Sequence, residues 1–137
     1  IAGANPSARV KNLQSENVHV SGWEDDIRAS YASAKVFIAP MLINIGLQNK
    51  ILEAMAMGLP CITSPLANNA IGGTDGENIL VAASPQQYAE RIFRLNDDTV
   101  FALSLAEKGN EFVKRNYTWE KCIGQLENIL GRLIKRN

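Results

Sequence analysis

The chain has 137 residues, 46% of them hydrophobic and 20% charged, the composition of a single soluble domain with one core. Its 14 basic and 14 acidic residues cancel, so no global field attracts nucleic acid or anionic lipid, and any anion site must be local. No apolar run approaches the roughly 20 residues that cross a bilayer. The separated cysteines, Cys61 and Cys122, suit reduced thiols in the cytoplasm.

Helical and strand-like patterns alternate along the chain. Residues 1–3 have the character of a strand end without its earlier residues, so we expect a piece of a longer protein. The pattern then predicts, in chain order, helix 6–14, strand 18–21, helix 25–33, strand 36–39, helix 47–57, strands 61–63 and 79–82, helix 85–95 and two closing helices, 98–115 and 118–135. This alternation predicts an α/β fold with a parallel sheet covered by helices on both faces. Ligands of such sheets bind where strands lead into helices, here at loops 22–26, 40–47 and 64–76.

Among these loops, the one that contains Gly46 carries the strongest chemical signal. It opens a helix whose first N–H groups and partial positive charge suit a phosphate. Asn49 and Lys50 stand four and three residues before Glu53, so the three side chains share one helix face. The Glu53 carboxylate could accept two hydroxyl hydrogen bonds from a ribose or a hexose.

Lys50 and the amides near Leu47 and Gln48 could balance the charge of a diphosphate at this turn. The structural alternative is that Lys50 and Glu53 form only a surface ion pair, which contributes about 0.2–0.5 kcal/mol. Gln48 and Asn49 would then merely start the helix. Spacing alone favours this structural alternative.

Other polar residues have good structural explanations. Asp25 and Asp26 stand at a helix start, where capping is favoured over a paired-carboxylate site. His19 lies between two valines in a short predicted strand, which favours a packed or surface histidine over a catalytic base. No carboxylate cluster has metal-ligand spacing, so we expect no metal site. Three glycines in a loop rich in Asn and Asp favour a turn over a phosphate cradle: Gly72, Gly73 and Gly76.

Several separated segments together resemble one family of enzymes. The run GLQNKILEAMAMGLPCITS resembles the donor-binding segment of bacterial GT-B glycosyltransferases of the large retaining family 4 (group 1), especially its exopolysaccharide-associated sugar transferases. The flanking segments agree in order: IAGANPSARVKNL, NVHVSGWEDDIRASYASAKVFIAPM, DGENILV and NYTWEKC. The resemblance implies that residues 1–137, with terminal helices at about 98–135, are one Rossmann-like, nucleotide-sugar-binding domain. It would be the C-terminal half of a two-domain enzyme, truncated at its N-terminus.

The resemblance also implies roles at matching positions. Glu53 would bind the ribose hydroxyls of a nucleoside diphosphate. The residues before it would surround the diphosphate and the donor sugar: Gly46, Leu47, Gln48, Asn49 and Lys50. Many family members carry a second glutamate eight positions earlier, which contacts the sugar. This chain has Ile45 there, so that contact is left open.

A second set of contacts is implied for the nucleotide base. Gly22 and Trp23 follow a predicted strand and, by analogy, border the base, on which the flat Trp23 ring could stack. Packing of Trp23 on a sheet edge or on the next helix is an equal alternative. The catalytic residues are implied to lie on the missing N-terminal domain.

Taken as a whole, the resemblance implies a hexosyl-type glycosyltransferase of bacterial polysaccharide biosynthesis, retaining and metal-independent. Its substrate would be a nucleotide-diphosphate sugar, with no cofactor, and its acceptor a glycan or a lipid-linked glycan held by the missing domain. The fragment alone would be inactive. The full-length enzyme would be cytoplasmic, with peripheral association at the inner face of the membrane, and would bind no nucleic acid. Two alternatives stay open: a GT-B-like sugar-nucleotide epimerase, and a non-enzymatic flavodoxin-like or receiver-like module.

Overall fold

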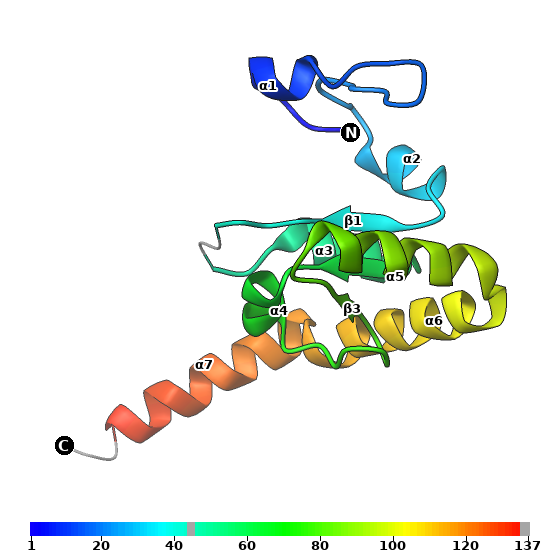
Figure 1. Cartoon of the computed structure of the whole chain (residues 1–137). Helices are drawn as coiled ribbons and strands as arrows, with labels where there is room; N and C mark the ends of the chain where they lie inside the picture. The colour runs from blue at the N-terminus through cyan, green and yellow to red at the C-terminus, as the bar shows by residue number, and fades with distance from the viewer. Residues whose placement is uncertain (44–45, 135–137) are drawn as a thin grey trace. The chain divides into compact units, whose positions relative to one another are not determined.

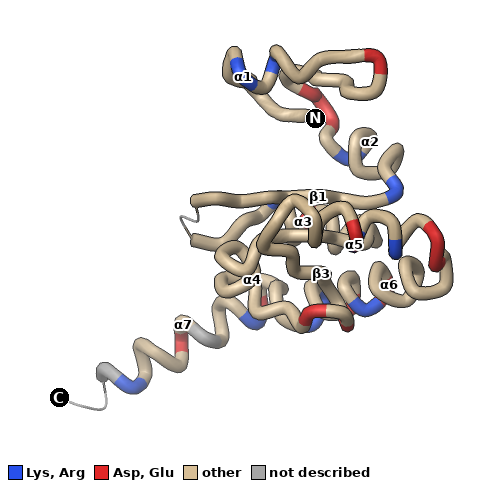
Figure 2. Tube along the Cα trace, in the orientation of Figure 1, with Lys and Arg blue, Asp and Glu red and all other residues tan. Residues whose placement is uncertain are grey.

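A computed structural model describes residues 1–43 and 46–134 of the chain. These residues divide into two compact units, Ile1–Ala34 and Lys35–Asn137 (Figure 1). Positively and negatively charged positions are interspersed along the described parts of both units, in keeping with the zero net charge (Figure 2). Ile45, where the resemblance places a sugar-contacting glutamate, lies outside the described residues.

The first unit contains two short helices, α1 (Ala8–Lys11) and α2 (Ile27–Ala32). The Asp26 carboxylate accepts the Arg28 backbone N–H, so its predicted role as a helix cap is confirmed. The strand predicted at 18–21 is not formed. The Ser21 N–H donates to the Ile1 carbonyl, the Ile1 amine donates to the His19 carbonyl, and Val18 forms an isolated bridge with Ser15, but these separate bonds do not make a ladder.

The second unit is built on a three-stranded parallel sheet with the order β1-β2-β3. The strands are β1 (Phe37–Ala39), β2 (Cys61–Thr63) and β3 (Leu80–Val81). All three residues of the central strand β2 are buried. Because successive strand side chains point to opposite faces, both faces of β2 are covered. The predicted parallel sheet with helices on both faces is therefore confirmed.

Five helices follow the strands of this unit. Four of them lie within a few residues of the predicted bounds: α3 (Asn49–Ala56), α5 (Pro85–Asp97), α6 (Thr99–Asn116) and α7 (Trp119–Ile134). The fifth, α4 (Pro65–Ile71), occupies most of the stretch predicted as loop 64–76, so that prediction was wrong. The Ser64 hydroxyl accepts the Ala67 N–H, Pro65 suits the first helical position, and Gly72 ends the helix at φ +73°.

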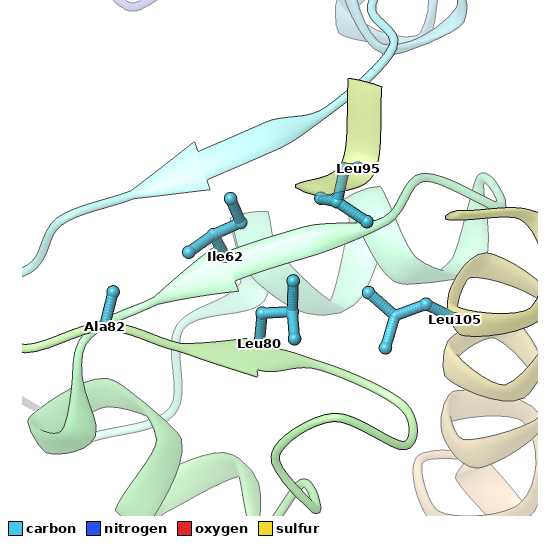
Figure 3. Packing of buried hydrophobic residues seen from close by; sticks show 5 residues of the cluster. All are labelled: Ile62, Leu80, Ala82, Leu95 and Leu105. Atoms are coloured by element: carbon cyan, nitrogen blue, oxygen red, sulfur yellow. The ribbon is translucent and has the colours of Figure 1, made fainter. Parts of the chain in front are cut away.

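The core of the second unit joins β2 and β3 to two helices. Its central cluster is formed by five buried side chains, which Figure 3 shows: Ile62, Leu80, Ala82, Leu95 and Leu105. The last two come from α5 and α6, so these helices are fixed against the sheet by apolar contact. Each large aliphatic side chain buried in this way stabilises the fold by about 1.5–3 kcal/mol.

The last helix, α7, carries an apolar face that the described residues leave open. Its exposed apolar side chains recur at three- and four-residue steps: Trp119, Ile123, Leu126, Ile129 and Leu130. The single apolar face expected from this spacing is therefore present. In the part of the chain that is described, no helix is long and apolar enough to cross a membrane.

Candidate functional site

The turn between β1 and α3 has the geometry expected of it. Gly46 has φ +76°, in the left-handed region that glycine adopts without strain. Gln48 then takes the N-cap position of α3 without a capping side-chain hydrogen bond, and the first turn of α3 has no acidic residue. The other described helices begin with a capping side chain: Ser7, Asp26, Ser64, Ser84, Asp98 and Thr118. The N-terminus of α3 is thus the one best suited to an external anion among the described helices.

Helix α3 has a buried face and an exposed face. Ile51, Ala54 and Met55 are fully buried. The polar side chains predicted to share a face, Asn49, Lys50 and Glu53, are exposed. The buried residues hold the helix against the core, while the polar residues lie on its solvent-exposed side. This division follows from the 3.6-residue period of the helix.

Glu53 lines a groove of about 560 Å³ within the second unit. One wall of this α3–α7 groove is formed by α3 and the residue before its cap: Leu47, Asn49, Leu52, Glu53 and Ala56. The opposite wall comes from the end of α6 and the start of α7: Val113, Tyr117, Thr118, Trp119 and Cys122. No donor-site role is predicted from sequence for this second wall, although NYTWEKC is among the segments that carry the resemblance.

The second wall is held in place by hydrogen bonds. The Tyr117 hydroxyl donates to the Ile71 carbonyl at 2.6 Å, which ties the end of α6 to the end of α4. Burial, with a smaller contribution from Cys122, raises the pKa of Tyr117, so this phenol stays protonated at neutral pH. Thr118 accepts the Lys121 N–H at 3.2 Å and so begins α7. The exposed Trp119 lies on this well-supported turn, with 82% of its surface accessible.

A second depression, of about 490 Å³, lies along β3 and α5. Its most prominent polar group, Asp75, accepts the Val81 N–H at 2.8 Å and pairs with Arg91 at 3.2 Å. Gln87 accepts the Ala83 N–H at 2.7 Å. Because these side chains serve the backbone of the edge strand, the depression has a structural explanation. The α3–α7 groove is the better candidate site.

Two other predictions concern the nucleotide base and metal binding. Gly22 and Trp23 belong to the first unit, where the Trp23 indole donates to Asp25 at 3.2 Å and 77% of Trp23 is exposed. Their contact with a nucleotide base stays a prediction. Within the described residues, no three His, Cys, Asp or Glu side chains come together as a metal site.

Comparison with known proteins identifies the family. The sequence profile described as "Glycosyl transferases group 1" matches residues 1–98, so the chain belongs to that family. A galactosyltransferase of Escherichia coli, named UDP-Gal:alpha-D-GlcNAc-diphosphoundecaprenol alpha-1,3-galactosyltransferase, is 30% identical over 94 residues, which are 67% of this chain and 24% of that protein. The lipopolysaccharide core biosynthesis glycosyltransferase LpsE of Rhizobium meliloti is 30% identical over 108 residues, 77% of this chain and 32% of LpsE.

The fold agrees with this assignment. The crystal structure of Anabaena HepE in complex with UDP-glucose matches 90% of this chain and 35% of HepE, with a TM-score of 0.77 and 19% sequence identity. The architecture is therefore that of GT-B glycosyltransferases, as the resemblance implies. The chain spans about a quarter to a third of the length of its curated relatives.

Proposed function

We propose that this chain is the donor-binding, C-terminal domain of a glycosyltransferase that uses a nucleotide-diphosphate sugar. The observation that carries the proposal is the position of Glu53, exposed on α3 and lining the α3–α7 groove one turn after a helix N-terminus without a side-chain cap. A carboxylate at this place can accept hydrogen bonds from two ribose hydroxyls, and helix N-terminal amides can donate hydrogen bonds to a diphosphate.

The chemistry assigns a task to each group of this site. Transfer breaks the bond between the anomeric carbon and a phosphate oxygen, the acceptor hydroxyl oxygen forms the new bond to that carbon, and the hydroxyl proton passes to the departing diphosphate. Negative charge builds up on the departing diphosphate while the sugar becomes oxocarbenium-like. We propose that the N-terminus of α3 and Lys50 stabilise that charge in place of a divalent ion, with Gly46, Leu47, Gln48 and Asn49 around the diphosphate and sugar. The outcome is proposed to be retention of configuration.

The relatives support the choice of substrates. The name of the E. coli relative gives UDP-galactose as its donor and a diphosphoundecaprenol-linked sugar as its acceptor. The Rhizobium relative acts in lipopolysaccharide core biosynthesis, and HepE binds UDP-glucose. We therefore propose that the full-length enzyme acts in polysaccharide biosynthesis, on a glycan or lipid-linked acceptor. The acceptor and the catalytic residues would lie with the other domain, on the cytoplasmic face of the membrane.

Nucleotide titration of a polypeptide that holds both domains tests the proposal. We expect UDP or GDP to bind measurably by calorimetry, and Glu53→Ala to weaken binding. Glu107→Ala is the matched control, because Glu107 is an exposed carboxylate on α6 outside the groove. Failure of every nucleoside diphosphate to bind, or equal losses in both variants, would contradict the proposed site.

A turnover assay tests the reaction class. The same polypeptide is incubated with a nucleotide sugar and a lipid-linked glycan, and the products are separated. We expect free nucleoside diphosphate and a lengthened glycan. An intact sugar nucleotide with one inverted carbon would instead identify an epimerase.

A further inference from the structure

The C-terminal end of α3 is capped by a backbone motif that leaves one carbonyl without a hydrogen bond from the motif. Gly58, at φ +74°, donates its N–H to the Met55 carbonyl, and Leu59 donates to the Ala54 carbonyl, both at 3.0 Å. These two bonds form a Schellman motif. The motif does not use the carbonyl of Ala56, the last residue of the helix.

That carbonyl is bound from α6. The Asn110 side-chain amide donates to the Ala56 carbonyl oxygen at 2.6 Å, and it lies 3.5 Å from the Met55 carbonyl oxygen. Ala56 and Glu53 both line the α3 wall of the groove, three residues apart on one helix face. Asn110 therefore holds α3 one turn beyond Glu53.

Asn110 also lies on α6, the helix that contributes Val113 to the opposite wall. Val113 follows Asn110 on α6 by three residues and so lies on the same side of that helix, and Tyr117 is the residue that ends the helix. The hydrogen bond from Asn110 to Ala56 consequently links α6, the helix that leads into the second wall, to a residue of the first wall. It adds a polar link between α3 and α6 at the end of α3, which the backbone motif alone does not provide.

The residue before Asn110 is Gly109, which allows close packing of α6 at this point. Gly109 is buried, and a Cβ atom there would come within 2.9 Å of the Asn78 carbonyl oxygen and 3.6 Å of the Met55 Cε atom. Gly inside a helix costs about 1 kcal/mol relative to Ala, so close packing is the physical reason for it at this position. The missing side chain lets α6 pack closely against the Asn78 carbonyl, while the Met55 side chain of α3 lies at ordinary contact distance, and this packing places Asn110 beside the end of α3.

We propose that Asn110 is a positioning residue for the donor site. It fixes the direction of the two-turn helix α3 from its C-terminal end, and with it the place of Glu53 and of the N-terminal turn that would receive the diphosphate. The inference rests on the proposed function of the groove. Because reaction and binding sites tolerate little displacement, a 1 Å shift can cost as much as about a hundredfold.

The test compares two asparagine variants in the two-domain polypeptide. Asn110→Asp keeps the shape but turns the donor into an acceptor facing a carbonyl, and Asn110→Ala removes the group. The matched control is Asn68→Ala, because the Asn68 amide also donates to a backbone carbonyl, that of Gly73 at 2.9 Å, but outside the groove. Affinity for UDP and GDP is measured by calorimetry, unfolding by Tm, and α3 mobility by hydrogen exchange.

We expect Asn110→Ala to weaken nucleoside diphosphate binding about tenfold, with a larger loss for Asn110→Asp and faster exchange over residues 46–57. Asn68→Ala should lower Tm comparably and leave the affinity nearly unchanged. Should Asn110→Asp fail to fold, Asn110→Ser provides the second, milder variant. Unchanged affinity in Asn110→Ala, or a loss that Asn68→Ala matches, overturns the positioning role while the proposed function stands. No binding by the unaltered protein overturns the proposed function instead.

Discussion

The Tyr117 hydroxyl reaches the Ile71 carbonyl across 46 residues of sequence, with a donor–acceptor distance of 2.6 Å. This bond connects the last turn of α6 to the last turn of α4, and Tyr117 also lines the α3–α7 groove. The wall that faces Glu53 is thus anchored to a helix that takes no part in the groove. Loss of the bond should loosen the wall and the fold together.

Tyr117→Phe is expected to lower the free energy of unfolding by about 1–2 kcal/mol, because it leaves the Ile71 carbonyl without its donor. Urea titration of the protein measures the effect. Tyr88→Phe serves as the control, since the Tyr88 hydroxyl is buried without a hydrogen-bond partner. Removal of that hydroxyl should be neutral or stabilising. Equal losses in the two variants would show that the Tyr117 bond contributes nothing specific.

The same two phenols predict a loss of stability in alkali. Burial raises the pKa of both Tyr88 and Tyr117 above the ordinary value. The folded state then holds the two phenol protons more tightly than the unfolded chain does. Their contribution to the free energy of unfolding is therefore complete below about pH 10 and is lost as the pH rises through the folded pKa values. Unfolding by urea on either side of about pH 10 measures the slope. The double variant Tyr88→Phe, Tyr117→Phe should flatten it, and an unchanged slope would refute the assignment.

Two helical glycines should respond in opposite ways to alanine. At Gly109 the added Cβ would lie 2.9 Å from the Asn78 carbonyl oxygen, so Gly109→Ala should destabilise the fold by about 1–3 kcal/mol despite the better helix propensity of alanine. Gly124 in α7 has nothing within 4 Å of that position, so Gly124→Ala should stabilise by up to about 1 kcal/mol. Thermal unfolding of the two variants measures both effects. A stabilising Gly109→Ala would contradict the close approach of α6 to the Asn78 carbonyl.

The turn at Gly46 should be sensitive to backbone strain alone. A Cβ atom there meets nothing within 4 Å, but its φ of +76° is unfavourable for any other residue. Gly46→Ala should therefore cost about 1–2 kcal/mol, and relaxation of the turn should weaken nucleoside diphosphate binding. Gly76→Ala is the control, because Gly76 has equal space and a similar φ of +77° but lies in the turn between α4 and β3, outside the proposed site. A Gly46 variant with normal affinity would show that the turn does not shape the site.

Local patterns were sufficient for most of the second unit. The alternation of strands and helices, which includes the predicted strand at 36–39 and the helices at the positions of α5, α6 and α7, predicted a parallel sheet with covered faces, which is present. Each of these signals comes from residues close in sequence. The wrong loop prediction over α4 also concerned a local signal, because Ser64 and Pro65 form a typical helix start.

The first unit shows what local pattern cannot decide. Residues 18–21 have the composition of a strand, yet a strand exists only when a neighbour supplies the other half of its hydrogen bonds. Within the described unit, Ile1 bonds residues 19 and 21 and Ser15 forms an isolated bridge with Val18, so these bonds come from two separate places and not from one neighbouring strand. Pairing is a property of two segments, and the residues of one of them do not specify it.

Some features of the candidate site likewise follow from local sequence, and others only from tertiary packing. The sequence by itself determined that Gly46 permits a left-handed turn, that Asn49, Lys50 and Glu53 share an exposed helix face, and that the chain resembles its family, because these depend on residue type and short spacing. Only the tertiary structure decided what stands opposite Glu53. The wall with Tyr117 and Trp119, and the bond from Asn110 to Ala56, join residues more than fifty positions apart. Such contacts arise from how whole helices pack, which no local pattern encodes.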